Sequence, residues 1–304
     1  MINTRRHEAG RGALLGTFVG DALGMPYEGL HLEAIPDRLE MAEARLGRGT
    51  YTDDTEMMIG LAESLLERGD VDPDHLAARF VENCDPGRGY GAGTLEVFDL
   101  WRSGVGVDEA AARVFGGRGS FGNGAAMRVA PVGVLFAADP ERVRAQARAS
   151  ARVTHAHPLG IDGAVAQAAA VRAAVCGEEI VGAAREAASS PEMIAALEIV
   201  AELVEERPAP GDAVRSLGHS SAAHRSVPTA IYAAIAHPDF ESAVEFAVRC
   251  GGDTDTIGAM AGAIAGARDG AEAIPGRWLD ALEDGPRGRA HVERLALELA
   301  DAGG

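Results

Sequence analysis

Tyr-Thr-Asp-Asp-Thr, at residues 51–55, sets two adjacent carboxylates between hydroxyl side chains directly before an amphipathic segment. The apolar residues of that segment recur at the spacing of one helix face, at Met58, Leu61, Ala62 and Leu65. Asp53 and Glu56 have the spacing of a capping box, which predicts that the acids mark the start of a helix over 56–68. Taken alone, Asp53 would be an ordinary helix cap, because carboxylates are stabilised at the positive N-terminal end of a helix.

A second stretch has the same chemistry, Gly-Gly-Asp-Thr-Asp-Thr at residues 251–256, and it also precedes a helical stripe. The apolar residues of that stripe are Ile257, Met260, Ala261 and Ile264. If the two clusters meet in the fold, their carboxylate and hydroxyl oxygens form a set of hard ligands, which Mg²⁺ and Mn²⁺ prefer. We therefore predict a metal site whose ligands come from nearly opposite ends of the chain.

The composition indicates closely packed helices and argues against a nucleic-acid-binding protein. Of the 304 residues, 47% are apolar, which is enough for a sizeable core. The 39 glycines and the many alanines predict that helices pack through small residues. The net charge is −18 and no basic block occurs, whereas contacts to a nucleic-acid backbone need clustered Lys or Arg.

The cysteines and the apolar runs favour a cytoplasmic protein. Cys84, Cys176 and Cys250 are widely spaced without a Cys-x-x-Cys pair, which argues against a disulfide framework and against structural zinc. No apolar segment follows the N-terminal arginines, so we expect no signal peptide. The most apolar run, residues 257–267, has 11 residues and is too short to span a bilayer, so we expect no membrane partner.

Helical periodicity runs through most of the chain, and no segment alternates with the period of a β-strand. Besides the helices after the two acidic clusters, helices are expected near residues 8–24, 72–83, 95–100, 139–153, 161–175, 191–206, 211–218, 240–250, 275–284 and 288–301, with another opening at Ser226. The predicted fold class is all-α. Because splitting the chain would separate the two acidic clusters, we expect one domain over residues 1–304, acting as a monomer.

A glycine-rich loop at residues 115–128 has the composition of an anion-binding segment. Its glycines would let backbone N–H groups approach phosphate oxygens, and Ser120, Gly122 and Asn123 supply further donors. Phe115 and Phe121 bracket three of the glycines and could stack on a planar base. The loop matches neither the dinucleotide fingerprint nor the Walker sequence, and a flexible turn without function is the alternative.

Three other polar side chains stand at loop positions. Pro26 and Gly29 break the first helix and leave Glu28 on a loop, as either a mobile acid or an ordinary exposed one. His155 and His157 have no third soft ligand nearby, so structural hydrogen bonding is the alternative to zinc ligation.

Five motifs, in order over roughly residues 10–270, resemble the ADP-ribosylhydrolases related to dinitrogenase reductase-activating glycohydrolase. They are Leu15-Gly16 through Gly20-Asp21-Ala22-Leu23-Gly24, Thr52-Asp53-Asp54-Thr55, Gly122-Asn123-Gly124 with Met127-Arg128, Thr154-His155, and Gly252-Asp253-Thr254-Asp255-Thr256. The resemblance implies a compact orthogonal multi-helix bundle, the ADP-ribosylglycohydrolase fold. It also implies a binuclear Mg²⁺ centre in a cleft, with Mn²⁺ as an alternative metal.

The resemblance also implies roles for individual residues. One metal ion would be held by Thr52, Asp53, Asp54 and Asp255, and the other by Asp253, Asp255 and Thr256. The diphosphate would be cradled by Gly119, Ser120, Phe121, Gly122 and Asn123. The adenine would be enclosed by Phe115 and Phe121, and His155 would reach the phosphate and the distal ribose. Glu28 or Asp253 would be the general acid or base.

The branch motifs bear on the bond that is cleaved. Residues 89–93, 119–123, 226–232 and 251–256 resemble the branch that acts on ADP-ribose linked to serine, in poly(ADP-ribose) and in O-acetyl-ADP-ribose. Thr-His-Ala-His-Pro at 154–158 is closer to the nitrogenase-regulating branch. The expected reaction is therefore hydrolysis of the C1″–O bond of the distal ribose. An arginine-directed hydrolase and an inactive ADP-ribose-binding relative are the alternatives.

Overall fold

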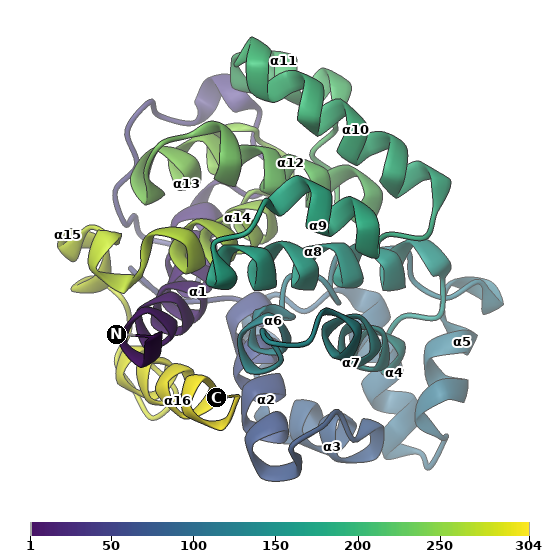
Figure 1. The fold of residues 1–304 in the computed structure, drawn as a ribbon. Coiled ribbons are helices and arrows are strands. Elements are labelled where there is room, and N and C mark those ends of the chain that lie inside the picture. Colours follow the sequence, from purple (N-terminus) through teal and green to yellow (C-terminus); the bar gives the residue numbers. More distant parts are fainter. Residues whose placement is uncertain (1, 304) are drawn as a thin grey trace.

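The chain folds into helices joined by loops and short 3₁₀ turns (Figure 1). The computed structural model describes residues 2–303, with side chains from residue 5 onward. The α-helices are α1 (Ile2–Gly24), α2 (Asp53–Arg68), α3 (Pro73–Asn83), α4 (Ala92–Arg102), α5 (Val107–Gly117), α6 (Ala130–Leu135), α7 (Pro140–Arg152), α8 (Pro158–Cys176), α9 (Ile180–Ala187), α10 (Pro191–Glu206), α11 (Pro210–Ser216), α12 (Ala223–Ala236), α13 (Phe240–Arg249), α14 (Thr254–Asp269), α15 (Gly276–Leu279) and α16 (Arg289–Ala302). The 3₁₀ turns are η1 (Met25–Tyr27), η2 (Leu32–Ala34), η3 (Pro86–Arg88) and η4 (Ala271–Ala273). Within residues 2–303 the β-type pairing is limited to an isolated bridge, so the all-α prediction is confirmed.

Two helices packed backbone to backbone, α1 and α14, form the centre of the fold (Figure 1). A Cβ on Gly16 would lie 2.7 Å from the carbonyl carbon of Gly262, and one on Gly12 would lie 2.6 Å from that of Gly266. Only glycine permits such close approach, so the predicted packing through small residues is confirmed here. The order of the pairs makes the helices antiparallel, which brings the end of α1, with Asp21, to the start of α14.

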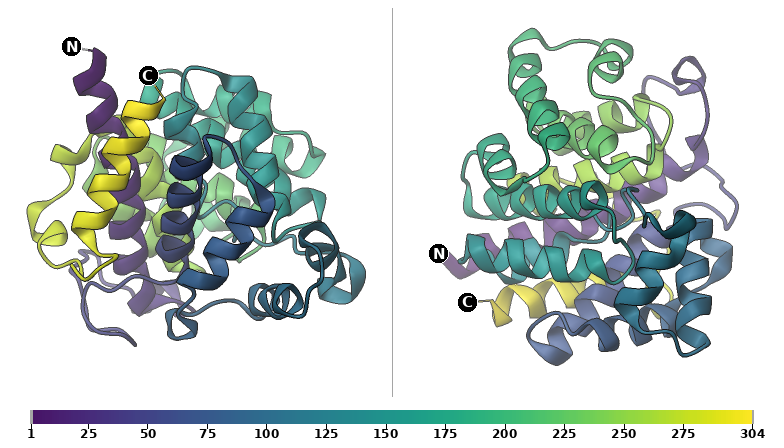
Figure 2. Two further views of the ribbon diagram at one scale, coloured as in Figure 1. Left: turned by 90° about the horizontal axis from the view of Figure 1, so that it is seen from below. Right: turned by 90° about the vertical axis from the view of Figure 1, so that its right-hand side faces the viewer.

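The other helices cover this pair from two sides (Figures 1 and 2). α8, α12 and α13 pack on α14, whereas α2, α6 and α16 pack on α1. α16 (yellow) runs beside α1 (purple), and a hydrogen bond between His7 Nε2 and Asp301 Oδ1, at 2.7 Å, links the first helix to the last. One hydrophobic cluster runs from α1 to α16, although the single-domain assignment stays a prediction.

The start of α2 differs in detail from the predicted capping box. The N-cap is Thr52, whose hydroxyl accepts a hydrogen bond from the backbone N–H of Asp54 at 3.3 Å, so Asp53 is the first helical residue. Glu56 does not close a box, because its carboxylate accepts a hydrogen bond from the hydroxyl of Tyr90 at 2.8 Å. The cap is therefore a hydroxyl, which leaves both carboxylates free for other partners.

Three of the described helices were not expected from the sequence, and a second apolar segment bears on the expectation about membranes. α5, α6 and α9 lie in segments for which no helix was predicted, and α12 begins three residues before Ser226. Among the described residues, α8 is long and apolar enough to cross a bilayer by length and composition, so residues 257–267 are not the sole apolar segment to consider. However, 78% of the apolar window in α8 is buried, as in the core helix of a folded protein.

Candidate active site

One cavity collects side chains from both ends of the chain. Its volume is about 380 Å³. The predicted site residues that line it are Glu28, Asp53, Asp54, Phe115, Ser120, Phe121, Gly122, Asn123, His155, Asp253, Asp255 and Thr256. Two predicted site residues do not line it: Thr52 is fully buried as the cap of α2, and the loop at Gly119 packs against residues 156–157.

The two acidic clusters meet at Asp54. Its Oδ2 accepts hydrogen bonds from Thr52 Oγ1 at 3.1 Å and from Thr256 Oγ1 at 3.3 Å, which joins the start of α2 to the start of α14. Its Oδ1 is buried and has no hydrogen-bond partner among the described residues. A buried oxygen without a partner is costly, and a divalent cation is the partner that carboxylate and hydroxyl oxygens suit. The side chains present therefore fit a hard metal ion.

Asp253 is held by the glycine-rich loop. It stands at the N-cap position of α14, yet its carboxylate forms no capping bond. Instead Oδ2 accepts a hydrogen bond from Asn123 Nδ2 at 2.6 Å, and the same amide group donates to Ser226 Oγ at 3.0 Å. Both N–H groups of the Asn123 amide are thus used, so its side chain orients Asp253 and has no donor left for a phosphate.

Behind the cluster, the fully buried Asp21 holds the start of α2 in place. Its carboxylate accepts the backbone N–H of Thr52 at 3.0–3.1 Å. It also accepts the backbone N–H and the hydroxyl of Thr55, at 3.1 and 2.6 Å. These are N–H groups that the first turn of a helix leaves without an internal partner. A carboxylate from α1 therefore fixes the segment that carries Thr52, Asp53 and Asp54.

The acids of the cluster have raised pKa values. Burial, reinforced by repulsion from Asp21, raises the pKa of Asp53 to about 8. Burial also raises the pKa of Asp21 to about 6, against the opposing effect of its hydrogen bonds. For Asp54 and Asp255, burial and then the charges of neighbouring carboxylates hold the pKa well above the usual value. Such crowding of buried negative charge is relieved by a bound divalent cation.

Glu28 approaches the cluster from a loop. Its side chain is 48% exposed, and one of its oxygens lies within 4.8 Å of carboxylate oxygens of both Asp253 and Asp255. The backbone N–H of Gly29 donates to the carbonyl of Gly252 at 2.9 Å, which ties this loop to the turn before Asp253. Glu28 is therefore exposed, as an ordinary surface acid is, and also close to the acidic cluster, as a mobile acid of the site would be.

Two exposed aromatic rings belong to the same cavity. Phe115 and Phe121 are 50% and 48% exposed, unusual for large apolar side chains. Phe115 has φ +54°, a left-handed conformation that strains a residue other than glycine and often marks a functional position. Its ring lies over Gly93, where an added Cβ would be 2.7 Å from it. The arrangement presents two flat apolar surfaces, as stacking on a planar ligand requires.

Some of the backbone N–H groups near these rings already have hydrogen-bond acceptors within the protein. The N–H groups of Gly119, Gly122 and Asn123 donate to acceptors within the protein. Those of Ser120 and Phe121 have no acceptor among the described residues. Binding of the diphosphate by this loop stays a prediction. Of the backbone N–H groups of residues 119–123, those of Ser120 and Phe121 remain as possible donors.

His155 contributes a neutral ring. It is buried, and its Nδ1 lies 2.8 Å from Thr154 Oγ1. Burial lowers its pKa to about 3, so the ring carries no charge at neutral pH and can donate one hydrogen bond. Within the described residues, the metal-type grouping of Glu28, Asp253 and Asp255 includes neither His155 nor His157, which leaves the zinc alternative without support.

Sequence reasoning assigned no role to some residues that shape the site. Asp21 is the main one, and the signal was an acid on the same helix face as Phe18 and Ala22. Gly91, Gly93 and Thr94 also line the cavity, within and after the branch motif at residues 89–93, whose individual residues have no predicted role.

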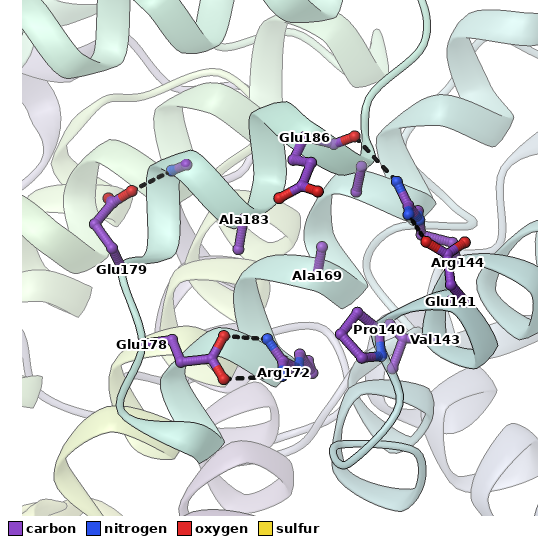
Figure 3. A pocket seen from close by; sticks show the side chains of 12 residues that line it. Pro140, Glu141, Val143, Arg144, Ala169, Arg172, Glu178, Glu179, Ala183 and Glu186 are labelled. Carbon is purple, nitrogen blue, oxygen red and sulfur yellow. Dashed lines mark hydrogen bonds and ion pairs between the residues drawn. The ribbon is translucent and has the colours of Figure 1, made fainter.

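A second cavity, of about 460 Å³, lies between α7, α8 and α9 (Figure 3). Most of its charged side chains are paired with one another: Arg172 with Glu178, and Arg144 with Glu141. Glu179 accepts hydrogen bonds from the first backbone N–H groups of α9. These groups stabilise the helices that form the cavity, whereas the 380 Å³ cavity holds an oxygen and N–H groups without partners.

Comparison with known proteins finds related chains over most of the sequence. A model of the ADP-ribosylglycohydrolase family matches residues 2–304. ADP-ribosylhydrolase ARH3 of Mus musculus is 37% identical over 90% of this chain and 87% of its own length. An uncharacterized protein of Archaeoglobus fulgidus is 38% identical over 95% of each chain. A solved structure described as an ADP-ribosylglycohydrolase-related protein complex has a TM-score of 0.81 and 32% identity, covering 99% of this chain and 100% of the other. The chain belongs to the ADP-ribosylglycohydrolase family.

Proposed function

We propose that this protein hydrolyses the C1″–O bond between ADP-ribose and a serine side chain, and the corresponding bond in poly(ADP-ribose) and O-acetyl-ADP-ribose. The observation that carries the proposal is the meeting of two acidic clusters in a cavity whose wall also bears two exposed aromatic rings. The mouse relative named ADP-ribosylhydrolase ARH3 supports the ADP-ribose moiety. The branch motifs at 89–93 and 226–232 favour the serine linkage.

The acids and hydroxyls would hold two Mg²⁺ ions, or Mn²⁺. The residues proposed as ligands are Thr52, Asp53, Asp54, Asp253, Asp255 and Thr256. When bound, such ions supply Lewis-acid charge that orients ribose hydroxyls and water. The protein's contribution is rigidity: Asp21 fixes the start of α2, and Asn123 fixes Asp253.

The other side chains of the cavity would bind the nucleotide. Phe115 and Phe121 would stack on the adenine, since both rings are half exposed at the cavity wall. The free backbone N–H groups of Ser120 and Phe121 would donate to the diphosphate. The neutral ring of His155 would donate to a phosphate or to the distal ribose, without adding charge.

Proton transfer at the glycosidic oxygen needs an acid and a base beside the distal ribose. Glu28 and Asp253 are the two candidates, and they differ in freedom: Asp253 is fixed by Asn123, whereas Glu28 stands on a loop. The profile of kcat/KM against pH for Glu28→Gln and Asp253→Asn assigns the roles. The variant that loses the acidic limb lacks the base, and the one that loses the alkaline limb lacks the acid.

The decisive experiment compares two linkages. The protein is incubated with Mg²⁺ and peptides that carry ADP-ribose on serine or on arginine, and released ADP-ribose is measured. Release from the serine peptide, abolished by EDTA, is expected. Release from the arginine peptide alone would overturn the serine assignment in favour of the arginine-directed reading of residues 154–158. Binding of ADP-ribose without release from either peptide would identify an inactive relative.

The ligand assignment has its own test. Asp53→Ala and Asp255→Ala are expected to abolish turnover and to weaken Mn²⁺ binding, as measured by titration calorimetry. Full activity of both variants in metal-free buffer would contradict the proposed centre.

A further inference from the structure

The carboxylate of Glu28 has a second neighbour besides the acids, the guanidinium of Arg45. Arg45 Nη2 lies 3.5 Å from Glu28 Oε2, while an oxygen of the same carboxylate lies within 4.8 Å of Asp253 and Asp255. Glu28 thus stands between the guanidinium of Arg45 and the carboxylates of Asp253 and Asp255. Within the described part of the chain, no other ion pair reaches Glu28, Asp53, Asp54, Asp253 or Asp255.

The guanidinium of Arg45 packs against the backbone of Gly89. At Gly89, an added Cβ would lie 2.7 Å from Arg45 Cζ, so the group rests directly on the glycine. Gly89 has φ +90° and is itself part of the cavity wall. The absence of a side chain at Gly89 therefore lets a cation from the loop after Glu28 reach the edge of the site.

The ion pair of Arg45 with Glu28 is weak enough to be replaced by a metal ion. Arg45 is 42% exposed and Glu28 is 48% exposed, and ion pairs between exposed side chains are weak. A divalent cation beside Asp253 and Asp255 would attract Glu28 more strongly than a solvated guanidinium does, because it carries twice the charge and bonds oxygen directly.

We infer that Arg45 is a positioning residue that holds Glu28 beside the acidic cluster and gives it up when a divalent ion binds at Glu28, Asp253 and Asp255. This inference rests on the proposed metal centre and adds Glu28 to its ligands. It predicts that Arg45 and the ion compete for one carboxylate, so removing Arg45 tightens ion binding. A residue that merely stabilised the loop would weaken ion binding when removed.

The test measures Mn²⁺ binding without substrate, by calorimetry and by the paramagnetic resonance signal of free Mn²⁺. Arg45→Ala should lower the Kd of the ion that Glu28 contacts by about two- to fivefold, the range set by an exposed ion pair. Arg45→Lys keeps the charge and should stay near the unaltered protein. Arg48→Ala is the matched control, since Arg48 is exposed in the same segment and has no ion pair in the described residues.

A double-mutant cycle isolates the shared carboxylate. In the Glu28→Gln background, Arg45→Ala should leave the Kd of Mn²⁺ unchanged. Weaker Mn²⁺ binding in Arg45→Ala, or an equal change with and without Glu28, would overturn the exchange while leaving the metal centre intact. Failure of the unaltered protein to bind Mn²⁺ would overturn the proposed centre, and the exchange with it.

Discussion

At the scale of single residues, the site depends on a buried carboxylate, that of Asp21, which does not line the cavity. Asp21 accepts hydrogen bonds from Thr52 and Thr55 and lies behind the acids rather than among them. Its effect on function is therefore indirect, through the position of the first turn of α2. This separates it from Asp53 and Asp54, which line the cavity.

Asp21→Asn should damage both the fold and the metal site. The amide places donors against the N–H groups that the carboxylate accepts, at a cost of about 1–3 kcal/mol in the free energy of unfolding. We expect Mn²⁺ binding to weaken about 10- to 100-fold, as when residues that orient metal ligands are removed. Chemical denaturation and calorimetry measure the two effects.

Asp162→Asn is the matched control for Asp21→Asn. Asp162 is also buried and accepts N–H groups at a helix start, those of Ser189 and Ser190 before α10. This variant should lose stability but keep its Mn²⁺ affinity. Equal loss of affinity in both variants would mean that Asp21 acts through general destabilisation.

Phe121→Ala should raise KM for an ADP-ribosylated substrate while leaving kcat nearly unchanged. Stacking of a base on an aromatic ring is worth about 1–3 kcal/mol, which corresponds to a change of roughly five- to hundredfold. Leu297→Ala, which removes an exposed apolar side chain from α16, is the control and should leave KM unaltered. Steady-state kinetics decide, and an unchanged KM in Phe121→Ala would count against the stacking role.

At the scale of elements, the antiparallel contact of α1 and α14 sets the geometry of the site, since it brings Asp21 to the start of α14. Gly262→Ala should destabilise the protein by about 1–3 kcal/mol or more, because the methyl group would meet the backbone of Gly16 and force the helices apart. Gly276→Ala is the control, because a Cβ there has no neighbour within 4 Å. Urea unfolding measures both, and an equal free energy of unfolding for the two variants would contradict the close contact.

The same elements show what the sequence could predict. α2 and α14 were predicted because each combines an acidic start with a regular apolar stripe, and both stripes are buried. α6 and α9 were missed because six and eight residues are too few for a clear helical period, and α6 also contains Pro131 and Gly133. α5 was missed because its last residues leave the helical conformation at Phe115, so that its end reads as a loop.

Site prediction reached the residues with a local signature and missed those whose role depends on the fold. The acids and threonines of each cluster are adjacent in the sequence, so a metal site could be predicted from them. Asp21 meets the backbone of Thr52 across 31 residues, and Arg45 meets Glu28 over the bare backbone of Gly89. No periodic pattern in the sequence predicts either contact, because each forms only when separate segments of the chain pack together.

At the scale of the whole molecule, the buried acids couple folding to pH. A carboxyl group with a raised pKa binds its proton more tightly in the folded state, so the stability it gives is present at low pH and is lost as pH rises through the folded-state pKa. For Asp53, this loss falls between the usual value of 3.8 and about 8, and for Asp21 between 3.8 and about 6. Without divalent ions, the protein should therefore lose stability from about pH 4 to pH 8.

Magnesium should remove this loss. A bound ion neutralises the carboxylates that protons neutralise at low pH, and the two compete for the same oxygens. In EDTA, we expect the Tm to be lower at pH 8 than at pH 5.5. Adding Mg²⁺ should raise the Tm more at pH 8, because more of the ligands are then free of protons. The Asp53→Asn and Asp255→Asn double variant should show a smaller response at both pH values. An equal rise in Tm at pH 5.5 and pH 8 would mean that the ion binds away from these acids. The raised pKa values of the acids would then be unrelated to metal binding.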